Sequence, residues 1–143
     1  ANKLSAEYGF TPPAATYHKL FRALNGETKM SKRDPINVIS LSDSEADVEK
    51  KIGNALTGGR DTAEEQRRLG GEIQKCVVYE LMASHFYDDD NELKRMRDDC
   101  TGGKILCGGC KAARIEKIKA FLRDHQKKKK AVLGRARKLV EDA

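Results

Sequence analysis

Residues 78–86 of the chain, VYELMASHF, decide the class of fold. The apolar members of this stretch recur at the three- and four-residue spacing of an α-helix: Val78, Leu81, Met82, His85 and Phe86. The run Asp-Asp-Asp-Asn at 88–91 ends the pattern. So wide an apolar stripe has to be covered by other elements, and we expect this helix to form the core of a small helical domain. His85 is then expected to be a hydrogen-bonded core residue.

The region before this helix predicts two shorter helices. Ser44, with Asp47 three residues later, has the pattern of a capping box, which is a common start of a helix. Asp61 with Glu64 repeats the pattern, and the two glycines at 70–71 predict the end of that short, charged helix. Both helices fit a mainly α-helical fold.

The region after it predicts a short helix over 92–99 and a long helix beyond Cys110 that is interrupted near Gly134. Residues 36–41 have the β-branched composition of a strand or an extended segment. A strand needs partners, and the rest of the chain offers none. We therefore infer that this segment belongs to a sheet whose other strands lie elsewhere, and that the chain is part of a larger protein.

The composition describes a highly charged protein with a modest core. The 143 residues suit one domain, or a small domain with part of another, and 38% are hydrophobic while 35% are charged. No stretch approaches the roughly 20 apolar residues of a membrane span. The N-terminus also has no apolar signal region. We expect a cytoplasmic protein without membrane contact.

The positive charge is concentrated at the C-terminal end. Residues 1–100 carry 15 Lys and Arg against 18 Asp and Glu, whereas residues 101–143 carry 13 against 4. Positive charge concentrated at one end of the chain favours binding of a polyanion such as RNA or DNA, because each neutralised phosphate releases counterions. The alternative is that these basic residues serve only to keep the protein soluble.

A short motif near the N-terminus has a chemical interpretation. It reads Lys29-Met30-Ser31-Lys32-Arg33. Two lysines three residues apart on a mobile loop can meet triphosphate oxygens and stabilise the negative charge that develops during nucleotidyl transfer. A solvated lysine pair is the alternative, because five residues alone carry little information.

The four cysteines form a pattern that suits metal binding. They are Cys76, Cys100, Cys107 and Cys110, and the last two are separated by two residues. Four thiolates can hold zinc or the corners of a four-iron four-sulfur cluster, and the glycines between them let the backbone turn tightly. A chain without an export signal also favours thiols over disulfides. Four reduced thiols without metal remain the alternative.

Several blocks together resemble a known family. GFTPPAATYHKL, KMSKRDP, KIGNALTGGRDTAEEQRRLGGE and YELMASHFYDDDNELKRMRDDCTGGKILCGGCKAA follow one another along the chain. In this order they strongly resemble the second half of archaeal and eukaryotic tryptophan-tRNA synthetases. The resemblance covers essentially the whole chain, and the blocks are specific in combination.

The resemblance implies two domains. Residues 1–57 would be the end of a Rossmann-like class I catalytic domain, and residues 58–143 a helical anticodon-binding domain. Lys29, Met30, Ser31 and Lys32 would form the KMSKS loop that closes over ATP with Mg, although Arg33 replaces the usual last Ser. The HIGH-type motif and the amino acid pocket are absent from the chain. We therefore expect it to be unable to activate tryptophan by itself.

The resemblance also implies an RNA-binding site. It places base-reading groups at Arg60, Asp61 and Lys111. Arg and Lys can donate hydrogen bonds to base acceptors, and Asp can accept one from the amino group of cytosine. A helix N-cap is the alternative for Asp61. Arg67 and Arg68 are candidates for phosphate contacts, or simply part of an exposed charged face.

Some synthetases of this family carry a four-iron cluster beside the anticodon site. An iron-sulfur cluster is therefore our first prediction for the four cysteines, and zinc is the second. The metal would be structural, since it would connect the loop bearing Lys104 and Lys111 to the helix bearing Cys76.

The resemblance thus implies the C-terminal part of a ligase that joins tryptophan to its tRNA. The expected partners are tRNA(Trp), the missing N-terminal half and, in the full-length enzyme, a second subunit. The alternatives are a part of the tyrosine enzyme and a non-catalytic, metal-stabilised RNA-binding module.

Overall fold

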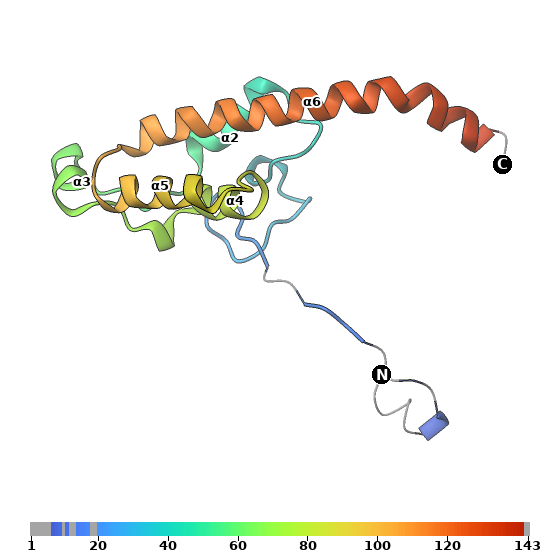
Figure 1. The fold of residues 1–143 in the computed structure, drawn as a ribbon, viewed down its shortest axis with the longest axis horizontal. Coiled ribbons are helices and arrows are strands. Elements are labelled where there is room, and N and C mark those ends of the chain that lie inside the picture. Colours follow the sequence, from blue (N-terminus) through green and yellow to red (C-terminus); the bar gives the residue numbers. More distant parts are fainter. Residues whose placement is uncertain (1–6, 10, 12–13, 18–19, 142–143) are drawn as a thin grey trace.

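The computed structural model describes residues 7–9, 11, 14–17 and 20–141. Within these ranges the chain forms a bundle of helices and no β-strand (Figure 1). Its elements, with η for a 3-10 helix, are η1 (Pro35–Asn37), α2 (Glu45–Asn54), α3 (Ala63–Leu69), η2 (Ile73–Lys75), α4 (Val77–His85), α5 (Asp90–Thr101) and α6 (Cys107–Glu141). The prediction of a mainly α-helical fold is confirmed. None of the described helices is both long and apolar enough to cross a membrane.

Helix α4 lies at the centre of the core, as its apolar stripe predicts. Its buried side chains are packed by residues from the neighbouring segments: Leu24, Val48, Ile52, Met96, Ile118 and Leu122. His85 departs from the prediction, because it is exposed at the end of α4 with its ring centroid 4.9 Å from that of Phe21. The prediction was wrong because the buried residues of α4 end at Met82.

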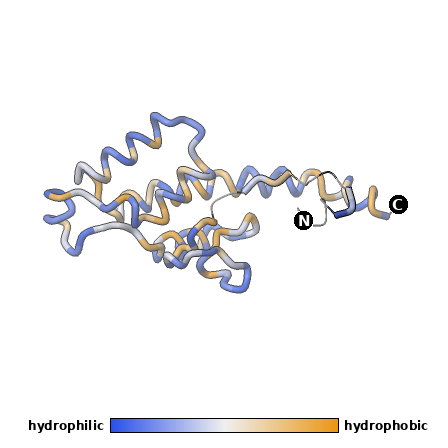
Figure 2. The backbone as a smooth tube through the Cα atoms, turned by 90° about the horizontal axis from the view of Figure 1, so that it is seen from below, coloured by the Kyte–Doolittle hydropathy of each residue, from blue (hydrophilic) through white to orange (hydrophobic). Residues whose placement is uncertain are grey.

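Helix α6 packs its first half along α2, and its second half extends beyond the body of the molecule (Figures 1 and 2). Ile118 and Leu122 belong to the buried side of the first half. Lys119 joins the two helices, because its Nζ forms ion pairs with Glu49 on α2 and Glu116 on α6. The hydrogen bond to Glu49, followed by that to Glu116, raises the pKa of Lys119.

The expected interruption of the long helix near Gly134 does not occur. Helix α6 continues through this residue to Glu141. The prediction was wrong because one glycine in an exposed helix interior costs only about 1 kcal/mol, which the neighbouring turns tolerate. The projecting half therefore remains one rod, and it carries the exposed run of four lysines at 127–130.

The segment before α2 forms no strand over 36–41, where the sequence predicts a strand or an extended segment. Pro35–Asn37 form η1, and Val38 follows with extended dihedral angles. Leu24 donates its N–H to the Asn37 carbonyl over 2.9 Å and accepts the Leu56 N–H over 2.7 Å. In the described part of the chain no second strand lies beside this segment, so a ladder cannot form.

The start of α2 is confirmed and the start of α3 is corrected. Ser44 and Asp47 form a reciprocal capping box, and the hydrogen bonds from Ser44 lower the pKa of Asp47. Helix α3, however, is capped by Thr62, whose side chain accepts the Glu65 N–H over 3.1 Å. The prediction that Asp61 caps this helix was wrong by one residue, since a threonine oxygen serves the same purpose.

A close backbone contact holds the end of α3 against the end of α5. Gly70 has a φ of 70°, and a Cβ on it would lie 1.8 Å from the carbonyl oxygen of Thr101. Gly71 then donates its N–H to the Cys100 carbonyl over 2.9 Å. No larger residue permits this approach, so glycine at position 70 positions the loop that builds the site described below.

Replacing Gly70 by Ala should destabilise the protein by more than about 1 kcal/mol, because it combines an unfavourable φ with a backbone clash. Gly134→Ala is the matched control. Nothing lies within 4 Å of a Cβ at that position, and alanine favours the helix by up to about 1 kcal/mol. Urea unfolding of both variants measures the two changes, and equal effects would contradict the proposed clash.

Candidate functional site

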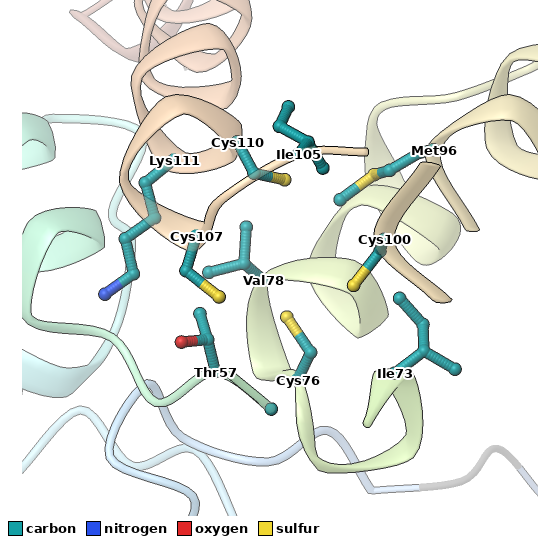
Figure 3. Close-up of a pocket in the computed structure, with 11 residues that line it drawn as sticks. Thr57, Ile73, Cys76, Val78, Met96, Cys100, Ile105, Cys107, Cys110 and Lys111 are labelled. Atoms are coloured by element: carbon teal, nitrogen blue, oxygen red, sulfur yellow. The ribbon is translucent and has the colours of Figure 1, made fainter. Parts of the chain in front are cut away.

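Two neighbouring hollows lie where the loop after α2, helix α3 and the start of α6 meet. One is a small cavity of about 10 Å³, shown in Figure 3. The other is an open polar pocket of about 340 Å³, lined by Thr57, Gly59, Arg60, Asp61, Thr62, Ala63, Gln66, Leu106 and Cys107. Thr57 and Cys107 line both hollows. The cysteine cavity and the polar pocket therefore share a wall.

All four cysteines line the cysteine cavity, although they come from three segments of the chain. Cys76 caps α4, where its Sγ accepts the Tyr79 N–H over 3.4 Å. Cys100 lies in the last turn of α5, and Cys107 and Cys110 lie in the first turn of α6. Figure 3 shows the sulfur atoms of Cys76, Cys100 and Cys107 pointing into the cavity. Helix α6 thus begins within the segment that the sequence predicts as a glycine-rich loop.

The surroundings of the thiols favour their neutral form. Burial, and then the neighbouring Cys76, Cys107 and Cys110, raise the pKa of Cys100 to about 11. Burial likewise raises the pKa of Cys110, although Arg114 opposes the shift. Among the described residues, no group of three or more His, Cys, Asp or Glu side chains is close enough to hold a metal ion. Burial therefore favours the protonated form of Cys100 and Cys110.

A buried amide beside this cavity lacks a partner. The Nε2 atom of Gln66 is inaccessible to solvent and forms no hydrogen bond. A Cβ on Gly71 would lie 3.0 Å from this nitrogen and 2.8 Å from the Sγ of Cys100. Four sulfur donors match the chemistry of a thiolate-bound metal, but the thiols as they lie in this structure do not form a site for one. The thiol side chains would have to turn outward, because the cavity has room for about one water.

Arg60 is held firmly at the edge of the polar pocket. Its backbone N–H donates to the Oε1 of Gln66 over 3.1 Å, and its Nε donates to the Gly70 carbonyl over 2.9 Å. Nη1 lies 3.6 Å from the carboxylate of Glu72. Asp61 follows on the rim of the pocket, exposed and not engaged as a helix cap. The guanidinium of Arg60 mainly holds the loop, while the carboxylate of Asp61 faces solvent.

The other predicted contact residues lie around the hollows. Lys111 lines the cysteine cavity, but its Nζ donates to the Gly53 carbonyl over 2.7 Å and points away from the sulfur atoms (Figure 3). Arg67 and Arg68 are exposed on α3 and line neither hollow. The structure thus brings Arg60 and Asp61 into one pocket and leaves the remaining cations around it.

The predicted phosphate-binding loop contributes no lining residue to either hollow. Lys29 and Lys32 are exposed. Between them Met30 packs against the hydrophobic core and donates its N–H to the Phe21 carbonyl over 3.0 Å. Ser31 accepts the Arg33 N–H at its Oγ over 3.3 Å. The loop is therefore anchored by its methionine and presents both lysines to solvent.

Two residues of the site were not identified from the sequence. Thr57 forms the shared wall, and Gln66 connects the polar pocket to the cysteine side. A glutamine within a charged helix has no distinctive spacing, so no local signal points to it. Its position four residues after the Thr62 cap, on the inner side of α3, is the one indication available.

The raised pKa of Cys100 predicts slow alkylation of the metal-free chain. With a pKa of about 11 in place of the ordinary 9.0, the thiolate at pH 8 should be roughly a hundredfold rarer than in the unfolded chain. Iodoacetamide labelling followed by mass spectrometry should show the rate rising as the pH increases from about 9 toward 11. The stability that the buried thiol contributes should be lost over the same range. Equal labelling rates in buffer and in urea at pH 8 would contradict this.

Comparison with known proteins identifies the family. The family model "tRNA synthetases class I (W and Y)" matches residues 1–123. The tryptophan–tRNA ligase of Archaeoglobus fulgidus is 47% identical over 133 residues, which are 91% of this chain and 31% of that protein. The ligase of Aeropyrum pernix is 44% identical over 141 residues, which are 99% of this chain and 38% of that protein.

Solved structures agree with the sequence matches. The crystal structure of tryptophanyl-tRNA synthetase from Aeropyrum pernix has a TM-score of 0.75 at 48% identity and covers 78% of this chain and 30% of that chain. The tryptophanyl-tRNA synthetase homolog from Entamoeba histolytica has a TM-score of 0.81 at 31% identity. The match covers 91% of this chain and 35% of that chain. The chain thus spans about a third of the length of these relatives. It therefore belongs to the family of class I tRNA synthetases for tryptophan and tyrosine.

Proposed function

We propose that this chain is the tRNA-binding C-terminal part of a tryptophan–tRNA ligase, and that it binds the anticodon through the polar pocket beside the cysteine cavity. The observation that carries the proposal is the exposed carboxylate of Asp61 on the rim of this pocket. Because Thr62 caps α3, the carboxylate is not required by the helix. It can accept a hydrogen bond from the amino group of a cytosine.

The charges around the pocket support RNA binding. Arg67 and Arg68 on α3 are exposed, as is Lys104, whose Nζ lies 3.8 Å from Asp99. The projecting half of α6 adds the lysines at 127–130. These cations would attract phosphates without reading sequence, whereas Asp61 and the edges of the pocket would contact the bases. Lys111 would join them by exchanging its contact with the Gly53 carbonyl for a base acceptor.

The activity of the whole enzyme would need more than this chain. The intact ligase would activate tryptophan with ATP and Mg and transfer it to tRNA(Trp). Residues 1–57 would then complete the catalytic domain, with Lys29 and Lys32 placed over the ATP phosphates. Their exposure and the anchoring of Met30 between them suit a loop that closes on a ligand. We expect the full-length enzyme to be a cytoplasmic homodimer, whereas the chain alone would bind RNA.

We further propose that the four cysteines hold a four-iron four-sulfur cluster, with zinc as the second choice. The support is the convergence of all four thiols on one cavity and the unpaired amide beside it. Bound metal would cross-link the segments that carry Cys76, Cys100 and the start of α6.

Binding of tRNA tests the role of Asp61. Asp61→Asn should weaken binding of tRNA(Trp) roughly tenfold, because the neutral amide has one acceptor oxygen and accepts a weaker hydrogen bond from a cytosine amino group than the charged carboxylate does. Asp88→Asn, at another exposed position, is the matched control and should bind normally. Filter binding with tRNA(Trp) and tRNA(Tyr) separates the tryptophan enzyme from the tyrosine enzyme.

Salt dependence distinguishes the RNA-binding module from the synthetase. A steep loss of affinity with salt and equal binding of all tRNAs would indicate phosphate attraction alone and would contradict anticodon recognition. Retained preference for tRNA(Trp) at higher salt would agree with it.

Substitution of Cys107 by Ser tests the metal centre. In anaerobically purified protein the variant should lose metal and melt at a lower temperature, since one ligand of the cross-link is missing. In the metal-free form the two proteins should melt nearly alike, which serves as the control. A brown absorbance spectrum identifies iron-sulfur and a colourless, zinc-containing protein identifies zinc. Unchanged metal content and unchanged melting of the variant would overturn the metal centre.

A further inference from the structure

A third pocket, of about 380 Å³, lies between α5 and the first half of α6, which run alongside each other (Figure 1). Lys117 on α6 connects the two helices, because its Nζ lies 3.2 Å from the carboxylate of Glu92 on α5. The charged residues that line this α5–α6 pocket are Arg95, Arg114, Lys117, Glu92 and Asp99. Met96 lines both this pocket and the cysteine cavity, so the two are neighbours.

Both carboxylates of the α5–α6 pocket already have a cationic partner. Glu92 pairs with Lys117, and Asp99 lies 3.8 Å from the Nζ of Lys104. The two arginines have none, since neither Arg95 nor Arg114 forms an ion pair with the part of the chain that the structure describes. The pocket therefore presents two guanidinium groups whose charges the described residues do not neutralise.

Arg114 also has a buried donor without an acceptor. Its Nε is inaccessible to solvent and forms no hydrogen bond with the described residues. The guanidinium carbon lies 5.8 Å from the centre of the Tyr87 ring, at the outer limit of a cation–π contact, and the Nζ of Lys117 lies closer to that ring, at 4.0 Å. Such a contact does not satisfy an N–H, and two cations gathered at one ring repel each other. An anion in the pocket would remove both costs.

We propose that the α5–α6 pocket binds a phosphate group, with Arg114 as its main ligand and Arg95 beside it. The forked donors of a guanidinium match phosphate oxygens and can bind two of them at once. A carboxylate has only two oxygens, which one such fork occupies, whereas a phosphate has oxygens for a second cation.

The backbone of a bound RNA is the favoured source of this phosphate. Arg114 lies in the region 101–143, where 13 Lys and Arg face only 4 Asp and Glu, and charge of this kind favours a polyanion. The inference rests on the proposed RNA binding for this source alone. A small phosphate compound is the other source, and the experiment below separates the two.

Two substitutions separate the charge of Arg114 from its shape. Arg114→Met keeps an unbranched apolar side chain beside Tyr87 but removes the charge and every donor. Arg114→Lys keeps the charge but loses the forked donors. Arg97→Met is the matched control, because Arg97 is an exposed arginine of α5 that lines none of the three hollows. Far-ultraviolet circular dichroism and urea unfolding test whether each variant keeps the fold.

The first measurement is filter binding of tRNA(Trp) by the 143-residue chain over a range of salt concentrations. Arg114→Met should weaken binding roughly tenfold and make the slope of log affinity against log salt shallower by about 0.7 to 1, because one phosphate contact is lost. Arg114→Lys should keep the slope but weaken binding about threefold, since a lysine binds phosphate only as a point charge. Arg97→Met should bind as the wild type does. An equal loss in Arg97→Met would overturn the site, because it would show a general attraction of charges.

The second measurement follows the Nε–H signals of the arginine side chains by heteronuclear NMR. The protein is titrated with inorganic phosphate at constant ionic strength, with chloride as the reference anion. The signal of Arg114 is identified by its absence from Arg114→Lys. It should shift at millimolar phosphate, whereas the signal of Arg97 should not move.

The two measurements distinguish the sources of the phosphate. Loss of tRNA affinity in Arg114→Met but not in Arg97→Met assigns the site to the RNA backbone. Wild-type tRNA binding in Arg114→Met, with an Arg114 signal that moves in phosphate, assigns it to a small phosphate compound. Wild-type tRNA binding with an unmoved Arg114 signal would overturn the site and leave the role of Asp61 untouched. A wild-type chain that binds no tRNA would overturn the proposed function, and the NMR titration would still decide whether the pocket binds phosphate.

Discussion

The close contact between the backbone after α3 and the backbone at the end of α5 governs the rest of the site. Gly70 lies so near Thr101 that a single methyl group would not fit between them. This contact brings Gly71 to the carbonyl of Cys100 and sets the distance from the cysteines to α3. The contact thereby holds α3, which lines the polar pocket, against the end of α5, which carries Cys100.

The same helices build the hydrophobic core and the cysteine cavity. Helix α4 supplies the core and is capped by a cysteine, whereas α6 carries two cysteines in its first turn and a stripe of core residues further along. A displacement of either helix would therefore change the cysteine cavity as well as the packing. The proposed metal would add to an arrangement that the hydrophobic core already determines.

The sequence predicted the elements well where the signal is local. The stripe of α4, the capping box at Ser44 and the glycine end of α3 depend on side chains a few residues apart. The errors occurred where another residue or another segment decides the outcome. Thr62 competes with Asp61 for the cap of α3. Gly134 lies in a helix whose other turns outweigh its cost.

The sequence by itself determined the helices, the basic C-terminal third and the set of four cysteines, because spacing and charge are properties of the chain alone. The tertiary structure decided which of these groups meet. It placed the cysteines of three segments around one cavity, turned the guanidinium of Arg60 toward Glu72, and buried the amide of Gln66 between the two hollows. Such contacts depend on the distance between backbones far apart in sequence, and no local pattern of residues encodes that distance.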